Sequence, residues 1–175
     1  MDLHVIFILH GYKANPEDMK KFLDIVTLSY PQAKCVLLHK CYSHGKCSLS
    51  FLADQAVEEM ITNLVTIQQR EQPRKIGRIS FIAHSIGGLV FRLAFKHPNL
   101  SHYKPLFHFF LSLNVPHLGL LFAKYTTELG AKLIKMFTES IQMGELLLTD
   151  QKDMRQTTLY KLTADDSKEI NQSQE

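Results

Sequence analysis

The sequence predicts an α/β fold in which helices cover both faces of a mainly parallel sheet, giving three layers. Short runs of β-branched and aromatic residues alternate along the chain with longer stretches whose apolar residues recur at helical spacing. This alternation favours parallel strands joined by right-handed helical crossovers. A chain of 175 residues with 45% hydrophobic content is large enough to bury one core. We therefore place a single domain at residues 1–164 and expect residues 165–175, which are polar and aperiodic, to be a disordered tail.

The first half of the chain predicts two strands and two helices. Residues 3–9 (LHVIFIL) form an apolar run typical of a strand buried on both faces. Asn15 and Pro16 are a suitable cap and first residue for a helix. Its core face is expected to carry four apolar residues at helical spacing, namely Met19, Phe22, Leu23 and Val26. A second strand is predicted at 34–39, followed by a long helix from an N-cap at Ser50 to residue 69.

The second half predicts a strand at 78–83, a helix directly after it, and a fourth strand at 106–113. An amphipathic helix is expected over about 120–137 and a short one over 145–149. The 78–83 strand should be central, with the 3–9 strand beside it. The 106–113 strand is expected to lie at an exposed sheet edge, where its unpaired backbone groups would favour association with another chain. Partial cover of this edge by the helix over about 120–137 is the alternative.

The change from strand to helix falls within Ala83-His84-Ser85-Ile86-Gly87. A small residue, a serine and a glycine at this spacing, between a strand and a helix, are the layout of a nucleophile elbow, where the serine adopts a strained backbone conformation. Ser85 is therefore the candidate nucleophile. The alternative, a serine that only completes a turn, is disfavoured by the strand before it and the helix after it.

Nucleophilic acyl transfer also needs donors aimed at the developing oxyanion. In this layout one donor is the backbone N–H of the residue after the nucleophile, here Ile86. The second comes from the loop after the preceding strand, and His10-Gly11-Tyr12 supplies it with Tyr12 N–H as the donor. Gly11 allows a tight turn there, and we expect His10 to order the loop.

Four segments carry a resemblance to a known family. HGYKANPEDM, AHSIGGLV, PHLG and RQTTLYKL together resemble the putative serine esterase family of α/β-hydrolases, which is lipase-like, over residues 4–162. The resemblance implies an α/β-hydrolase-like fold and hydrolysis of carboxylic esters, in particular lipid esters, through an acyl-enzyme at Ser85. The expected substrate is thus a small ester or a lipid.

The sequence departs from the hydrolase pattern at the catalytic acid and base. In such folds the acid and then the histidine follow the serine, on loops after later strands, and no sequence after Leu113 has strand character. We expect the chain to lack the C-terminal strands. His117 is the candidate base, with a loop-ordering histidine as the alternative reading, while Asp150 has no strand before it. The alternative function is a catalytically incomplete hydrolase-fold protein with a binding or regulatory role.

The sequence gives little support for binding of nucleic acid or a metal ion, or for a membrane span. The net charge is +3, and the basic residues are scattered apart from a short loop with Arg74, Lys75 and Arg78, which gives no footprint for nucleic acid. Cys41, His44 and Cys47 lack the paired spacing typical of zinc, although His39 could be a fourth ligand. Free thiols and no metal or other cofactor are therefore expected. An odd number of cysteines and an amino terminus without a charged leader favour the cytoplasm. No apolar stretch reaches the roughly 20 residues of a membrane span, and peripheral membrane contact stays open.

Overall fold

The computed structural model describes residues 2–41, 46–120 and 140–164. Its contacts divide the chain into two compact units, which are described separately below. Unit 1 comprises Met1–Tyr42 and Ser50–Val115, and unit 2 comprises Ser43–Leu49 and Pro116–Glu175. The helix expected over 120–137 and the tail expected over 165–175 fall, apart from residue 120, outside the described residues. No helix in the described part of the chain is both long and apolar enough to cross a membrane.

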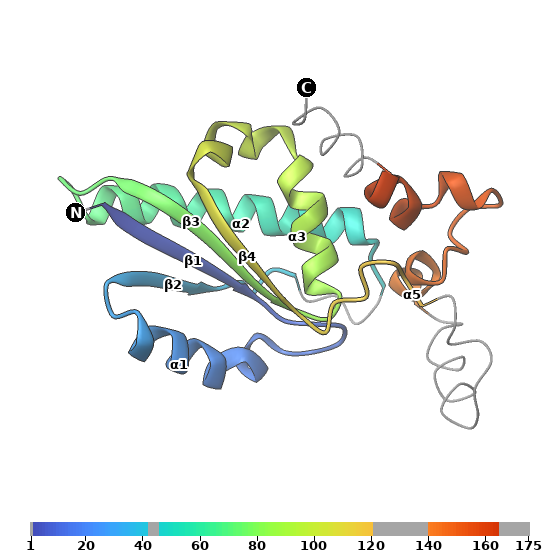
Figure 1. Ribbon diagram of the computed structural model, residues 1–175, viewed down its shortest axis with the longest axis horizontal. Coiled ribbons are helices and arrows are strands. Elements are labelled where there is room, and N and C mark those ends of the chain that lie inside the picture. Colours follow the sequence, from blue (N-terminus) through green and yellow to red (C-terminus); the bar gives the residue numbers. More distant parts are fainter. Residues whose placement is uncertain (1, 42–45, 121–139, 165–175) are drawn as a thin grey trace. The chain divides into compact units, whose positions relative to one another are not determined.

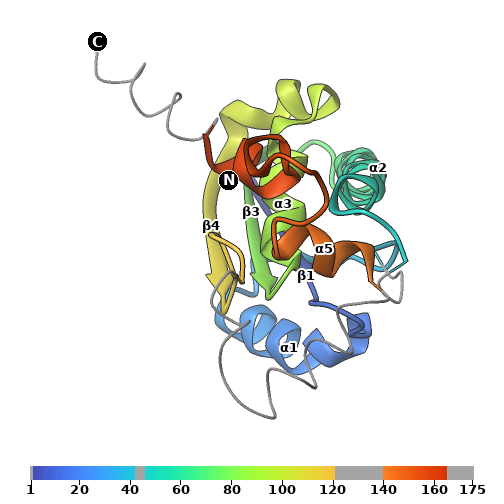
Figure 2. The same ribbon diagram turned by 90° about the vertical axis from the view of Figure 1, so that its right-hand side faces the viewer.

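Unit 1 is built on a parallel sheet with the order β2-β1-β3-β4. The strands are β1 (Leu3–Leu9), β2 (Ala33–Leu37), β3 (Ile76–His84) and β4 (Phe107–Leu113). The helices are α1 (Lys20–Ser29), α2 (Leu49–Arg70) and α3 (Gly87–Lys96), with 3-10 turns η1 (Pro16–Met19) and η2 (Pro98–Leu106). Figures 1 and 2 show α1 on one face of the sheet and α2 with α3 on the other. The four predicted strands, their parallel pairing and the inner position of β3 beside β1 are confirmed.

Each face of the sheet has its own apolar layer. Under α1, Ile6, Ile8 and Ile82 pack with the predicted helix face, of which Met19 and Val26 are buried. On the opposite face, under α3, aromatic rings gather around the buried side chain of Phe81, whose ring centroid lies 4.6 to 6.2 Å from four others. These rings are Phe7, Phe91, Phe95 and Phe107. The double burial explains why β1 and β3 are almost continuously apolar.

Local chemistry accounts for the helix starts and for one wrong boundary. Asn15 forms the expected cap, accepting a hydrogen bond from Glu17 N–H, and Asp18 completes a capping box. The cap at Ser50 was wrong, because α2 already begins at Leu49. The second strand ends at Leu37 and not at residue 39, since the backbone N–H of His39 donates to a side chain instead of continuing the ladder.

Unit 2 contains α5 (Ile141–Leu146) and the 3-10 turn η4 (Met154–Gln156), and residues 158–164 are also helical. The short helix predicted at 145–149 was misplaced. Leu148 has a φ of 56°, its N–H donates to Glu145 O, and Thr149 N–H donates to Gly144 O at 2.9 Å. This is the Schellman pattern that ends a helix. Most of the predicted segment is therefore the terminating turn of α5.

The edge of the sheet at β4 is irregular. Phe107 lies opposite Ile79 and Phe110 lies opposite Phe81, so β4 has one more residue than β3 in this interval, which is a bulge. Within the described residues β4 pairs with β3 alone, and the side chains of Phe109 and Leu111 are 40% and 42% exposed. The edge position of β4 is confirmed among the described residues. Exposure of this edge and association through it stay predictions, because the helix expected over 120–137 lies almost wholly outside those residues.

Candidate active site

Ser85 lies in the sharp turn between β3 and α3, at the carboxyl end of the sheet. Its φ is 54°, in the left-handed region that a residue with a side chain seldom adopts. Its N–H donates to Leu113 O at 2.9 Å, and its carbonyl accepts from Gly88 N–H at 3.1 Å. The turn is thus fixed from both sides, by the end of β4 and by the first turn of α3. This strand–turn–helix geometry with a strained serine is the backbone arrangement expected from the sequence.

Glycines allow the loop after β1 to touch this turn. A Cβ on Gly11 would lie 2.8 Å from the Cβ of Ser85, and a Cβ on Gly87 would lie 2.4 Å from the carbonyl oxygen of His10. Contacts below 3 Å are steric overlaps, so neither position has room for a side chain without a shift. The loop after β1 and the amino end of α3 are consequently in direct backbone contact around Ser85.

The two candidate oxyanion donors flank this contact. Tyr12 follows Gly11, and Ile86 follows Ser85 at the amino end of α3, where the helix dipole is positive. Within the described residues, neither of these two backbone N–H groups donates a hydrogen bond to the protein. Both amides therefore retain their donor capacity next to the serine, which is what an oxyanion site requires.

His10 controls the direction of one of these donors. Its side chain is only 4% exposed, and Nδ1 lies 2.9 Å from the carbonyl oxygen of Gly11, so Nδ1–H donates to it. The Gly11 carbonyl and the Tyr12 N–H belong to one trans peptide plane and point in opposite directions. Fixing the carbonyl toward His10 therefore turns the Tyr12 N–H away from it. Burial is the main cause that lowers the pKa of His10 and keeps the ring neutral.

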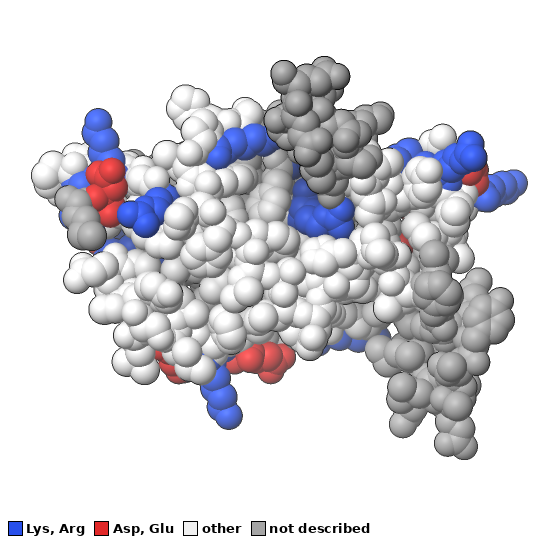
Figure 3. All heavy atoms as spheres, viewed as in Figure 1, with Lys and Arg blue, Asp and Glu red and all other residues white. Residues whose placement is uncertain are grey.

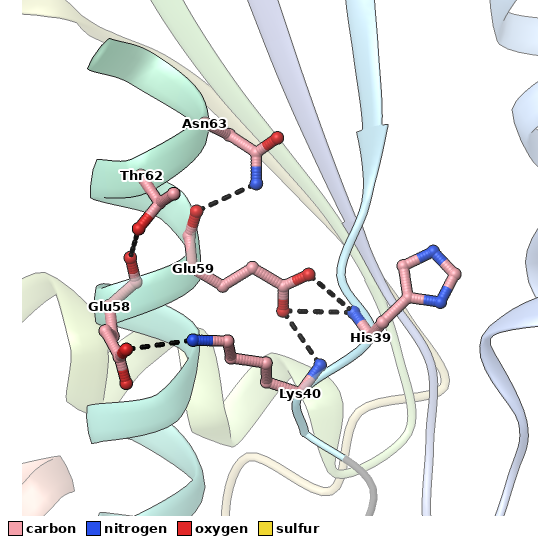
Figure 4. A network of polar contacts seen from close by, with 6 residues as sticks. All are labelled: His39, Lys40, Glu58, Glu59, Thr62 and Asn63. Carbon is pink, nitrogen blue, oxygen red and sulfur yellow. Dashed lines mark hydrogen bonds and ion pairs between the residues drawn. The ribbon is translucent and has the colours of Figure 1, made fainter. Parts of the chain in front are cut away.

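Glu59 of α2 secures the neighbouring loop after β2, as Figure 4 shows. Its carboxylate accepts hydrogen bonds from the backbone N–H of His39 at 3.0 Å and of Lys40 at 2.8 Å, while Lys40 Nζ pairs with Glu58 at 2.9 Å. The charge of Glu59 also acts on His10, raising its pKa against the larger effect of burial. Sequence reasoning missed Glu59, because it lies mid-helix in no motif and its partners are 19 and 20 residues away in the chain.

His117, the candidate base, and Asp150 lie in unit 2, whereas Ser85 lies in unit 1. The pairing of His117 with Ser85 therefore stays a prediction. Asp150 Oδ2 accepts hydrogen bonds from the backbone N–H and the hydroxyl of Thr158, both at 2.9 Å, which gives this carboxylate a structural task. Its Oδ1 is buried and has no partner within the described residues.

The cysteines show no sign of a metal centre within the described residues. Cys35, Cys41 and Cys47 are free thiols there, and no three potential ligands come together in the described ranges. Cys41 is buried with its Sγ 3.5 Å from the carbonyl oxygen of Leu52, and burial raises its pKa to about 12. His44, the middle residue of the spacing considered for zinc, falls outside the described residues.

Comparison with known proteins decides the family. A family model described as putative serine esterase matches residues 1–174. The chain belongs to the putative serine esterase family. The resemblance seen in the four sequence segments is thereby confirmed.

Two solved structures of one phospholipase confirm the fold. Phospholipase PlaB from Legionella pneumophila, in complex with thio-NAD, matches with a TM-score of 0.55 at 14% identity, over 92% of this chain and 34% of that chain. A second PlaB structure matches with a TM-score of 0.54 at 12% identity, over 92% and 35%. An acetylxylan esterase gives a TM-score of 0.47 at 14% identity, over 67% of this chain and 64% of that chain. This chain spans about a third of the length of PlaB and shares its α/β fold.

Proposed function

We propose that the protein is a serine hydrolase that cleaves carboxylic esters through an acyl-enzyme at Ser85, with the turn around it acting as a nucleophile elbow. The observation that carries the proposal is the strained backbone of Ser85, whose φ is 54° and which lies in close contact with Gly11 of the loop after β1. Membership of a family of serine esterases supports the same reaction. A serine that only completed a turn would have no need of two adjacent amides without protein partners.

The proposed reaction uses the residues around the turn in sequence. Ser85 Oγ attacks the ester carbonyl and gives its proton to a base, and the C–O bond to the alcohol then breaks as that proton passes to the leaving oxygen. Ile86 N–H and Tyr12 N–H stabilise the oxyanion of each tetrahedral intermediate. Water then hydrolyses the acyl-enzyme by the same route. His117 is the proposed base.

Lipid esters are the proposed substrates. The lipase-like segments of the sequence support this choice, and the similar structure of PlaB is that of a phospholipase. The surface supports it as well, because β4 exposes Phe109 and Leu111, two large apolar side chains on one strand.

A fluorophosphonate probe tests the proposal, because it labels only an activated serine. We expect labelling of the wild type at Ser85, no labelling of Ser85→Ala, and unchanged labelling of Ser101→Ala, a matched change at an exposed serine of η2. Hydrolysis of p-nitrophenyl butyrate should fall by roughly 10³-fold or more in Ser85→Ala. His117→Ala should lower it similarly if His117 is the base. Absence of labelling in the folded wild type would contradict the proposal for this chain.

A further inference from the structure

A cavity of about 370 Å³ opens at the opposite end of the sheet from Ser85, among the amino ends of β1, β2 and β3. All of its lining residues belong to unit 1. Its walls come from the start of each of these strands, from the end of α1 with the turn that follows it, and from the loop before β3. In Figure 1, β1 and β3 run from the end marked N toward the turn that joins β3 to α3.

The cavity exists because one row of the sheet is left uncovered. Ala33, His4 and Arg78 are lateral neighbours on β2, β1 and β3, and they lie on the face that packs against α1. Further along the strands, α1 covers Ile6 and Ile8 on this face. The helix ends at Ser29, and Ala33 has too small a side chain to fill the space beyond it.

The charges around this row are mainly positive. Arg78 makes no ion pair with any described residue, and Arg74 stands on the rim with its Nη1 3.7 Å from Glu71. Glu71 is in turn engaged by Lys34 at 2.6 Å. Asp2 is the acidic residue of the lining. With Arg74, Arg78 and Lys34 against Glu71 and Asp2, the surroundings carry a formal charge of +1 before any histidine is protonated; Figure 3 shows basic groups with acidic atoms between them at this end.

His4 adds a further group able to contact an anion. Its Nε2 lies 2.7 Å from the hydroxyl of Ser80, which is fully buried, and its ring centroid lies 5.7 Å from that of His108. Burial is the largest cause that lowers the pKa of His4, and the positive charges of His108 and Arg78 add to it. A bound anion would offset the repulsion among these three groups.

The uncharged part of the cavity lining can pack against an organic group. Tyr30 and Pro31, in the turn after α1, add an aromatic and an aliphatic surface to the lining of the cavity. The volume falls at the lower end of the range of about 300–1,000 Å³ found for small-molecule sites. A bare inorganic ion would leave much of this space to water.

We propose that this cavity binds a phosphomonoester, with the phosphate held by Arg78 and His4 and the organic part lying against Tyr30 and Pro31. Arginine binds phosphate oxygens with two parallel donors, and an imidazole N–H supplies a third. The phosphate can belong to a soluble metabolite or to a lipid head group, since both present the same dianion. The site is separate from the Ser85 turn and does not rest on the proposed hydrolase activity.

Calorimetric titration with glycerol 3-phosphate tests the proposal, with glycerol as the probe that lacks the phosphate. We expect binding of the phosphate compound alone, weakened tenfold or more by Arg78→Gln. Ala33→Leu, which fills the cavity without changing charge, should weaken binding as strongly. Arg155→Gln removes the same charge from an exposed position in unit 2 and should change affinity less than twofold. Thermal unfolding of each variant shows that it is folded.

Vesicles distinguish the source of the phosphate. Phosphatidylcholine vesicles with and without phosphatidic acid are sedimented with the wild type and Arg78→Gln. Binding that needs both phosphatidic acid and Arg78, without binding of glycerol 3-phosphate, supports the site and assigns it a lipid head group. The proposal is overturned if neither probe binds at about 1 mM, or if Arg155→Gln weakens binding as much as Arg78→Gln. Fluorophosphonate labelling of Ser85 should be equal in all variants, which separates this test from that of the hydrolase.

Discussion

The two ends of the sheet in unit 1 are built on different principles. At the carboxyl end, backbone meets backbone: Gly11 and Gly87 have no room for a Cβ, and the groups offered to a ligand are amides. At the amino end, side chains from three strands and two loops surround an open space, and the groups offered are a guanidinium and an imidazole. One sheet thus has a proposed site made of backbone groups at one end and a proposed site made of side chains at the other.

This difference predicts how the two ends of the sheet respond to small substitutions. A site made of backbone amides depends on close contacts between backbone segments, so one added methyl group can move the amides out of place. A site made of side chains depends on which residues lie side by side on adjacent strands. The residues around such a site can shift without removing its binding groups. The same small substitution should therefore have very different effects at the two ends.

The largest effect is expected for Gly87→Ala. The new Cβ would lie 2.4 Å from the carbonyl oxygen of His10, which is backbone and cannot rotate away. We expect a loss of about 3 kcal/mol in the free energy of unfolding, together with loss of fluorophosphonate labelling. Chemical denaturation measures the first quantity.

Gly144→Ala is the matched control for that change. A Cβ on Gly144 would come no closer than 3.8 Å to Thr149 Oγ1, and Gly144 lies within α5. Alanine should stabilise this helix by about 0.5–1 kcal/mol. A loss of less than about 1 kcal/mol in Gly87→Ala would show that the carboxyl end is not held by close backbone contact.

A smaller effect is expected for the pH dependence of stability. The pKa of His10 is lowered in the folded protein, so between its ordinary value near 6.5 and the folded value the unfolded state binds more protons. Stability is therefore complete above pH 6.5 and falls as the pH is lowered through this window. His10→Gln should remove this contribution to the acid-side loss of stability and so flatten the profile.

Denaturation between pH 5 and 7.5 measures this slope. His102→Gln, at an exposed side chain, is the matched control. His4 is only half-buried, so His4→Gln should flatten the profile less than His10→Gln. Equal slopes in the wild type and His10→Gln would refute the assignment of a buried neutral imidazole to the carboxyl end.

The smallest effect is expected for Gly77→Ala at the amino end. The new Cβ would meet Asp2, whose Cβ lies 2.6 Å from its position, but Asp2 is exposed and precedes β1, so it can move aside. Alanine also favours the strand more than glycine does. The free energy of unfolding should change by less than about 1 kcal/mol. A loss as large as that of Gly87→Ala would remove the contrast between the two ends.

The sequence predicted the carboxyl end because its determinants are local. The strand, the turn and the helix around Ser85 are consecutive, and the glycines that permit the backbone contacts appear within the motifs themselves. The strand order followed from the need to bring the His10 loop beside Ser85. Such features can be predicted from the sequence when the residues that determine them lie close together in the chain.

The remaining features depend on contacts between distant residues. Glu59, in the middle of α2, accepts a hydrogen bond from the loop after β2. The cavity is lined by Ala33, His4 and Arg78, which lie side by side on three different strands. No local pattern marks either set. The end of α5 was missed for another reason, because Leu148 occupies the left-handed position where glycine is the usual signal.

The bulge in β4 has a consequence for how the protein behaves at high concentration. Fibril growth needs six or seven consecutive residues that pair in register with the next chain. The extra residue between Phe107 and Phe110 interrupts the edge, and only the short stretch from Phe110 to Leu113 keeps regular spacing. An incoming strand would lose its alignment after a few residues. We therefore expect the irregular edge to oppose the association predicted from the sequence, so that the exposed side chains of Phe109 and Leu111 do not seed cross-β aggregation.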